Sequence, residues 1–378
     1  MDLSFLVVVV IITALVFDFT NGFHDTANAM ATSIATGALR PKVAVTVSAV
    51  LNLVGAFIST AVATTISSGL VDDSKMTVPI IFGGLVGAIL WNLVTWYFGL
   101  PSSSSHALFG GLIGATWIAA GSGAINFGTV VQKIILPAIA APIVAGAVAL
   151  VGTFLAYLIT RRARKKSVEA GYNKGQIASA SMLSLAHGTG DAQKTMGVIT
   201  LVLITSGSLA KGSPPPTWVI FSAGLAIALG TYFGGWRIIR TMGKGLTEIE
   251  SPQGFTAESS STAVLLASSH LGFPLSTTQV CSGSILGTGL GKRLAEVRWT
   301  VARRMAMAWL FTLPAAAVVG ALAGQVASSG NFGVVIVAVL AVVASAGIYA
   351  ASRRRPVTPE NVNDDPASTP AATTAAVS

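Results

Sequence analysis

The chain has 378 residues, of which 52% are hydrophobic, 40 are glycines and only 10% are charged. Soluble globular domains carry about 25% charged residues, so this composition excludes a protein that faces water on all sides. The formal net charge of +9 does not require a nucleic-acid partner, because most lysines and arginines form short clusters between apolar stretches. We therefore expect an all-α polytopic membrane protein.

Several apolar stretches are long enough, or nearly so, to cross the ~30 Å hydrocarbon core of a bilayer as helices. The first is not a secretory signal, because it starts with Asp2, lacks an A-x-A cleavage site and runs into a polar motif. We interpret it as the first membrane span. In chain order, the stretches cover residues 3–17, 43–66, 79–100, 134–159 and 334–350.

Basic clusters separate these stretches, at residues 40–42, 161–174, 237–244, 292–304 and 353–355. The positive-inside rule places such clusters in the cytoplasm. This orients the N-terminus outside and the C-terminus inside, in a multi-pass protein of the cell membrane. After Arg355 the chain is rich in Pro, Ala, Thr and Asp, which predicts a disordered cytoplasmic tail.

Two motifs recur in the same order in the two halves of the chain. N-G-F-H-D-T-A-N-A-M from Asn21 matches H-G-T-G-D-A-Q-K-T-M from His187, and G-L-P-S-S-S-S-H-A from Gly99 matches G-F-P-L-S-T-T-Q-V from Gly272. Two ordered pairs at nearly equal offsets indicate a duplicated unit. Because the basic linker between the copies faces the cytoplasm, we expect the two units to be inverted repeats.

Each Pro-Ser/Thr motif lies between segments that are too short and too rich in glycine for two clean spans. We therefore expect broken helices, with re-entrant hairpins at residues 79–120 and 261–291. Inverted repeats with broken helices are typical of secondary transporters that bind their substrate near the midplane. The predicted parts are a first transmembrane repeat (1–160), a basic cytoplasmic linker (161–178), a second, inverted repeat with a last span (179–352) and the tail (353–378).

Charged residues inside the bilayer cost at least ~2.5 kcal/mol each, so the few that occur are informative. Asp25 and Asp191 occupy equivalent repeat positions, which favours a binding role over incidental helix packing. Lys194 follows Asp191 by one helical turn and is either part of the pathway or only its salt-bridge partner. Asp18 has no counterpart in the second half, and its role is open between structure and function.

Hydroxyl groups cluster just after Pro101 and Pro274, where a new helix would begin. A helix N-terminus offers free N–H groups and the positive end of its dipole, so two facing hairpins would hold a small oxyanion. Histidine titrates near neutral pH, which makes the histidines candidates for proton coupling. The hydroxyl residues are Ser102, Ser103, Ser104, Ser105, Ser276, Thr277 and Thr278, and the histidines are His24, His106, His187 and His270.

The motifs at Gly22–Ala29 and Ala186–Lys194, with the two hairpins, resemble those of the inorganic phosphate transporter (PiT) family, bacterial low-affinity type. The resemblance covers the chain up to the tail. It implies phosphate uptake by a symporter coupled to H⁺ or Na⁺, in some bacterial members with phosphate complexed to a divalent metal such as Mg²⁺. It implies no cofactor and leaves the metal ligands and the oligomeric state open, a homodimer being one option.

Carried onto this sequence, the resemblance places Asp25, Asp191 and the hairpin hydroxyls in the phosphate site, and Asn21 and Asn28 in the cation coordination of the first signature. The second copy departs from the sodium-dependent type, because Gln193 and Lys194 stand where A-N-A tends to recur, and Gly190 stands where an Asn commonly precedes the Asp. A fixed ammonium at Lys194 can supply the charge that a bound Na⁺ supplies elsewhere. We therefore favour H⁺ over Na⁺ as the coupling ion, with the histidines and carboxylates as carriers.

Phosphate keeps at least one proton at neutral pH, whereas sulfate keeps none. A buried carboxylate accepts a hydrogen bond from a phosphate O–H but repels sulfate, so Asp25 and Asp191 favour phosphate. A sulfate permease on the same scaffold is the alternative. We do not expect an enzyme, because neither G-x-S-x-G nor H-E-x-x-H occurs in the sequence.

Overall fold

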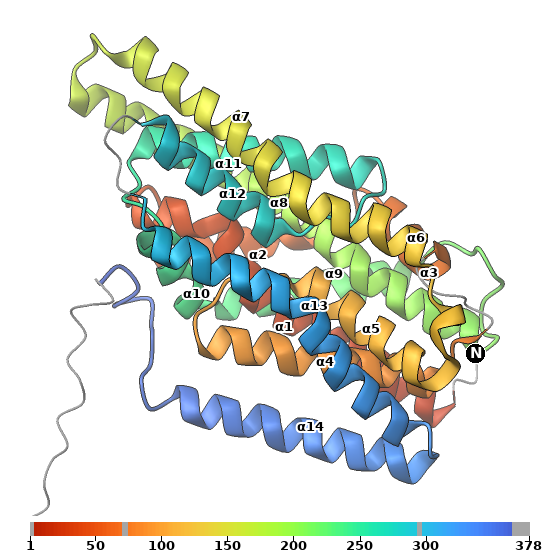
Figure 1. Ribbon diagram of the computed structural model, residues 1–378. Coiled ribbons are helices and arrows are strands. Elements are labelled where there is room, and N and C mark those ends of the chain that lie inside the picture. The colour runs from red at the N-terminus through yellow and green to blue at the C-terminus, as the bar shows by residue number, and fades with distance from the viewer. Residues whose placement is uncertain (1–3, 70–74, 293–296, 365–378) are drawn as a thin grey trace, which may run out of the picture.

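The computed structural model describes residues 4–69, 75–292 and 297–364, and helices dominate this part of the chain (Figure 1). The first half contains α1 (Phe5–Ala35), α2 (Pro41–Gly55), α3 (Ala61–Gly69), α4 (Val78–Tyr97), α5 (Ser104–Ala120), α6 (Phe127–Val130), the π-helical η3 (Val131–Ile135) and α7 (Leu136–Thr160). The second half contains α8 (Lys165–Thr205), α9 (Thr217–Phe233), α10 (Trp236–Arg240), the π-helical η4 (Thr241–Gly245), α11 (Ser251–His270), α12 (Thr277–Gly291), α13 (Trp299–Ala327) and α14 (Asn331–Ser352).

Within these described ranges, α1, α4, the continuous α6–η3–α7 helix, α13 and α14 are long and apolar enough to cross a membrane. A sixth candidate span is formed by α9 with α10 and η4, which bends by 63° at its break. Many large apolar side chains of α7, α13 and α14 face outward, as expected for surfaces that contact lipid. The prediction of an all-α polytopic membrane protein is confirmed.

The stretch 43–66 differs from the single span that its hydropathy suggests, because it breaks between α2 and α3. The amide groups of Val62 and Ala63 at the start of α3 donate to Oε1 of Gln193, at 2.7 and 3.3 Å. A side chain from α8 thus satisfies backbone groups that a continuous helix would have satisfied internally. Gln193 therefore supports a broken helix.

The helices α4 and α5 form one antiparallel pair, and α11 and α12 form a second. In Figure 1, the open end of the first pair, where α4 begins and α5 ends, lies at one end of the bundle. The open end of the second pair, where α11 begins and α12 ends, lies at the opposite end. Gly99 and Gly272 stand at equivalent repeat positions after α4 and α11, with φ of +64° and +70°, a conformation that side chains with a Cβ rarely adopt. This arrangement is compatible with inverted re-entrant hairpins; the repeat symmetry itself stays a prediction.

The glycines of the two signatures lie where helices approach each other closely. A Cβ on Gly22 would stand 2.3 Å from the carbonyl oxygen of Ile227 in α9, and one on Gly188 would stand 2.3 Å from that of Asn52 in α2. Small residues allow membrane helices to pack at short distance. These two contacts seat α1 against α9 and α8 against α2.

Two further boundaries differ from the expected ones. Residues 165–178 of the basic linker are the first turns of α8, and residues 353–364 of the tail form ordered turns. Arg240 donates to the carbonyl and side-chain oxygens of Asn361, at 2.6 and 2.8 Å, and Val362 is buried, so this part of the tail is held against the bundle. Residues 365–378 of the predicted disordered tail lie outside the described residues.

Candidate functional site

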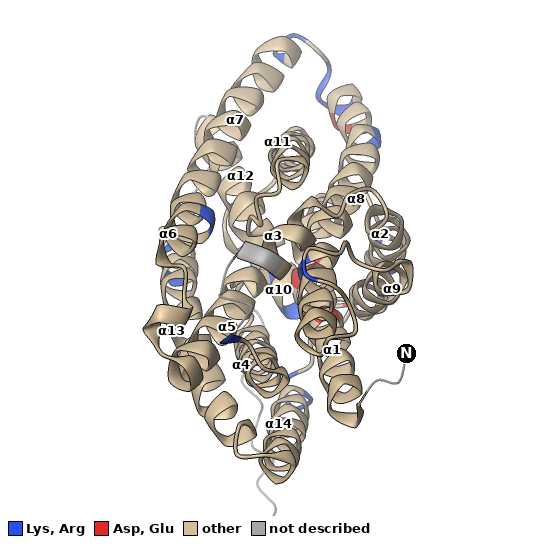
Figure 2. Ribbon diagram, turned by 90° about the vertical axis from the view of Figure 1, so that its right-hand side faces the viewer, with Lys and Arg blue, Asp and Glu red and all other residues tan. Residues whose placement is uncertain are grey.

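The two signatures lie on α1 and α8, and both helices run unbroken through them. Asp18, Asn21, Asp25 and Asn28 follow one another at spacings of three, four and three residues, which places them on one face of α1. All four are buried. Viewed along the bundle, acidic residues lie in its centre, surrounded by helices (Figure 2).

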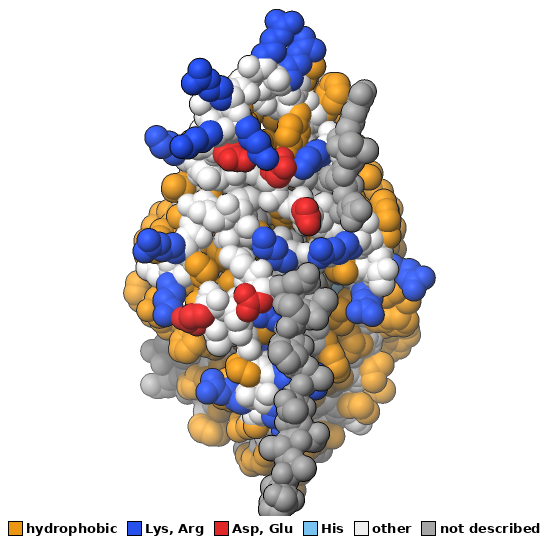
Figure 3. Space-filling view, turned by 90° about the vertical axis from the view of Figure 1, so that its left-hand side faces the viewer, with side chains coloured by type: hydrophobic (Ala, Val, Ile, Leu, Met, Phe, Trp, Pro, Cys, Tyr) orange, Lys and Arg blue, Asp and Glu red, His pale blue; other side chains and the backbone are white. Residues whose placement is uncertain are grey.

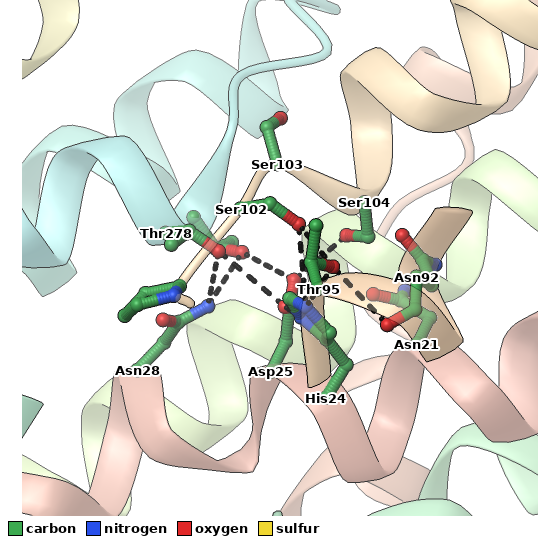
Figure 4. Close-up of polar contacts among 12 residues, drawn as sticks. Asn21, His24, Asp25, Asn28, Asn92, Thr95, Ser102, Ser103, Ser104 and Thr278 are labelled. Atoms are coloured by element: carbon green, nitrogen blue, oxygen red, sulfur yellow. Dashed lines mark hydrogen bonds and ion pairs between the residues drawn. The ribbon is translucent and has the colours of Figure 1, made fainter. Parts of the chain in front are cut away.

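Asp25 is the centre of a network of hydroxyl groups (Figure 4). Its carboxylate accepts hydrogen bonds from Ser104 of the first hairpin at 2.7 Å and from Thr277 and Thr278 of the second at 3.3 and 3.4 Å. Nδ1 of His24 lies 2.6 Å from the same carboxylate. Two hairpins far apart in sequence therefore converge on one aspartate.

Asp191 is surrounded differently, because charged and titratable side chains contact it. Nζ of Lys194 lies 2.6 Å from its Oδ1, and Nε2 of His187 lies 3.3 Å from its Oδ2. The same Oδ2 accepts hydrogen bonds from Thr277 at 3.3 Å and from the Asn21 amide at 3.4 Å. Thr277 thus bridges the two aspartates of the two repeats.

The remaining predicted hydroxyls hold the helix starts around this cluster. Ser103 caps α5 by accepting from the His106 amide at 3.1 Å, and Ser276 caps α12 by accepting from the Gln279 amide at 3.3 Å. Ser105 donates to the carbonyl of Leu275 at 3.4 Å, which links the two hairpins. The N-termini of α5 and α12 therefore lie beside the aspartates, which is the arrangement that the predicted anion site needs.

Asn28 completes the ring from the first signature. Its amide donates to the hydroxyls of Thr277 and Thr278, at 3.2 and 3.1 Å. Ser102 lies one step further out and donates to Thr95 at 2.8 Å. Asn21 thus contacts Asp191 directly, whereas Asn28 contacts hydroxyls that in turn contact Asp25.

The four histidines are not equivalent in the structure. Nε2 of His24 lies 3.2 Å from the hydroxyl of Thr95, while Nδ1 of His187 lies 3.1 Å from the side-chain oxygen of Asn52. His106 is buried at the start of α5, and His270 is exposed at the end of α11, outside the buried cluster. Two of the four, His24 and His187, therefore contact an aspartate directly.

Sequence reasoning missed a fourth buried carboxylate, Glu258 on α11. It accepts hydrogen bonds from Thr32 and Ser33 on α1, both at 2.6 Å, and from Gln176 at 3.2 Å and Ser179 on α8. The predicted hairpin began at residue 261, so Glu258 fell outside the segment expected in the membrane. A lone Glu in a Ser- and Thr-rich helix without Asp, Lys or Arg was the signal that could have found it.

The site also offers a set of metal-binding atoms. One ligand atom from each of Asp25, His187 and Asp191 lies within 4.8 Å of the others, and all three residues are buried. Two carboxylate oxygens and an imidazole nitrogen suit several divalent metals. These three residues are therefore candidate ligands for a metal ion.

The phosphate transporter family matches residues 21–171 and again residues 158–320. The chain belongs to this family. The protein named "Probable low-affinity inorganic phosphate transporter" in Mycobacterium bovis is 57% identical over 364 residues, which are 96% of this chain and 87% of the relative. One of the same name in Bacillus subtilis is 42% identical, over 85% of this chain and 97% of the relative.

A solved structure titled "The sodium-dependent phosphate transporter" has the same fold, with a TM-score of 0.77. It is 23% identical and covers 85% of this chain and 99% of that chain. The family, the relatives and the fold are those of membrane transporters of phosphate, not of enzymes. The resemblance seen in the sequence motifs is thereby confirmed.

Proposed function

We propose that this phosphate transporter imports inorganic phosphate across the cytoplasmic membrane by secondary active transport coupled to protons. The proposal rests on one observation: the buried carboxylates of Asp25 and Asp191 both contact the hydroxyl of Thr277, and Lys194 is bound to Asp191. This cluster combines acceptors for the phosphate O–H with hydroxyl donors and helix N-termini for its oxygens.

The carboxylates support phosphate over sulfate. Their acceptor oxygens pair with a protonated oxyanion and repel one that has no proton, and such repulsion is a strong source of selectivity inside a low-dielectric site. The donors for the anionic oxygens are Ser104, Thr277 and Thr278, at the starts of α5 and α12. A sulfate permease on this scaffold would leave both carboxylates without a donor from the substrate.

Lys194 supports proton coupling. A lysine is covalently bound to the chain, so its ammonium group stays beside Asp191, where a transported metal cation would otherwise lie. The charge that crosses with phosphate is then left to protons, carried by the phosphate itself or by side chains such as His24, His106 and His187.

The cluster of Asp25, His187 and Asp191 supports carriage of phosphate together with a divalent metal such as Mg²⁺. A metal ion between the carboxylates would neutralise their charges and contact a phosphate oxygen at the same time. The proposed cargo is therefore either protonated phosphate or its metal complex, bound by one set of residues.

The orientation with the N-terminus outside is supported by the distribution of charge. Figure 3 shows lysine and arginine side chains spread over one end of the molecule, where the connection between α7 and α8 lies. The positive-inside rule assigns that end to the cytoplasm.

The substrate is tested by uptake of radiolabelled phosphate into proteoliposomes under an inward proton gradient. We expect uptake that excess unlabelled phosphate abolishes and that an equal excess of sulfate leaves nearly unchanged. Added Mg²⁺ that raises phosphate uptake and enters with it would identify the metal complex as cargo. Equal competition by sulfate, or sulfate uptake at the same rate, would contradict the proposal.

A further inference from the structure

Asp18 is a buried carboxylate that the phosphate site does not use. It lies on the polar face of α1, seven residues before Asp25, which is about 10 Å along the helix. It is fully buried, and neither of its oxygens accepts a hydrogen bond from the residues that the structure describes. An ionised carboxylate without partners at bilayer depth is costly, so its retention calls for a ligand.

Two side chains near Asp18 also have buried oxygen atoms without a hydrogen-bond partner among the described residues. The hydroxyl of Thr195 on α8 and the side chain of Asn21 on α1 lie within reach of the carboxylate. Thr195 Oγ1 and Asn21 Oδ1 are buried, and each is without a hydrogen-bond partner among the described residues. The Thr195 hydroxyl has one proton to donate, whereas Asn21 Oδ1 and the ionised Asp18 carboxylate only accept, so the group has room for one more proton or a metal cation.

The charged groups that act on Asp18 come from α8. They are Asp191 and Lys194, and they are bound to each other at 2.6 Å. The helix α4, which also packs against α1, contains no Asp, Glu, Lys, Arg or His, and the same holds for α9. Since Lys194 is already paired with Asp191, no described cation neutralises Asp18.

We propose that Asp18, Asn21 and Thr195 bind the small monovalent cation that drives transport, at a site next to the phosphate site. The inference deepens the proposed function, in which that cation is a proton. A proton on Asp18 can be donated to the oxygen of Asn21, while Thr195 donates to the other carboxylate oxygen, so a single bound cation satisfies all three side chains. Asn21 also contacts Asp191, so this one side chain connects the cation site at Asp18 to the phosphate site.

The test separates binding of phosphate from coupling. In proteoliposomes, a gradient of one pH unit can drive about tenfold accumulation of phosphate per coupled proton, whereas exchange of labelled for unlabelled phosphate needs no net cation movement. We expect Asp18→Asn to lose gradient-driven accumulation while measurable exchange continues. Asp18→Glu, which keeps the carboxylate, should retain accumulation, and Asp364→Asn in the exposed tail serves as the control.

Thr195→Val is a second variant that keeps the charge of Asp18. If the cation is a proton, Thr195→Val removes a hydroxyl that can donate to the ionised form of Asp18. Protonation of Asp18 is then favoured, so the pH of half-maximal uptake should rise by about one unit. If the cation is Na⁺, loss of an oxygen ligand should raise the Na⁺ concentration for half-maximal uptake. The matched control is Thr200→Val, a buried threonine of α8 whose hydroxyl donates to the carbonyl of Met196.

Failure of the Asp18 site can be distinguished from failure of the proposed proton coupling. If wild-type uptake follows a Na⁺ gradient, proton coupling is wrong, and the Asp18 site is then upheld only if Asp18→Asn abolishes Na⁺-driven accumulation. Undiminished accumulation by Asp18→Asn overturns the site, as does parallel loss of exchange and accumulation in a folded variant. An unchanged cation dependence in Thr195→Val overturns it even if Asp18→Asn does not fold.

Discussion

The two signatures each contain an aspartate, and the two aspartates differ in the side chains that contact them. Asp25 is contacted by the hydroxyls of Ser104, Thr277 and Thr278, which are neutral donors. Asp191 is contacted by the ammonium of Lys194. Each aspartate also contacts a histidine, His24 or His187, but only Asp191 is paired with a lysine. We infer that this asymmetry determines which ion must accompany phosphate.

The largest expected effect comes from removing either acceptor. Asp25→Asn and Asp191→Asn should each lower phosphate uptake at least about thirtyfold, because losing a buried, hydrogen-bonded charge typically costs about 2 kcal/mol or more. Uptake of radiolabelled phosphate measures the loss, and size-exclusion chromatography of the purified variants controls for folding. Near-normal uptake by either folded variant would remove that aspartate from the site.

Replacing the counter-charge tests the asymmetry itself. Lys194→Asn introduces the side chain found at Asn28, the equivalent position of the first repeat. We expect it to lose most proton-driven uptake or to acquire a requirement for Na⁺, since Asp191 then lacks its cation. Uptake that is unchanged in rate and in ion dependence would reduce Lys194 to a structural ion pair.

Thr277 is the group that the two aspartates share. Thr277→Val should lower the affinity for phosphate about tenfold, the effect of losing one hydrogen bond to a charged group. Thr262→Val is the matched control, because the hydroxyl of this buried threonine on α11 donates to the carbonyl of Glu258 within the same helix. Equal KM values for the two variants would show that the bridge between the repeats does not bind substrate.

The smallest effects separate the histidines. His24→Gln should lower uptake several-fold, because Nδ1 of His24 contacts Asp25, while His270→Gln at the exposed end of α11 should stay within about twofold of wild type. Uptake is compared between pH 5.5 and 8, where histidine titrates. A pH profile altered only by His270→Gln would reverse this assignment.

The sequence predicted the class of fold, and its candidate site residues include side chains that the structure brings together, but it did not predict the course of individual helices. Apolar length and the rarity of intramembrane charge pointed to the spans and to Asp25 and Asp191. The break between α2 and α3 was not predictable, because the groups that stabilise it come from Gln193, more than a hundred residues away. Hydropathy reports local composition and carries no information about such contacts.

The same limit applies to polar side chains near the ends of expected segments. Glu258 was missed because the predicted hairpin began at residue 261, whereas α11 begins at Ser251. The turns of residues 353–364 were missed because their contacts are with Arg240 and the end of α1. Composition predicted disorder there, and tertiary hydrogen bonds overrode it. The roles of the individual site residues stay predictions until variants are measured.

The most direct test of the account is the driving ion of wild-type transport. Radiolabelled phosphate uptake is measured in proteoliposomes with an inward proton gradient without Na⁺, and with an inward Na⁺ gradient at equal internal and external pH in the presence of a protonophore. The account predicts accumulation in the first condition and none in the second, because Lys194 already occupies the place of a cation beside Asp191. Accumulation driven by Na⁺ alone and unaffected by the protonophore would contradict it.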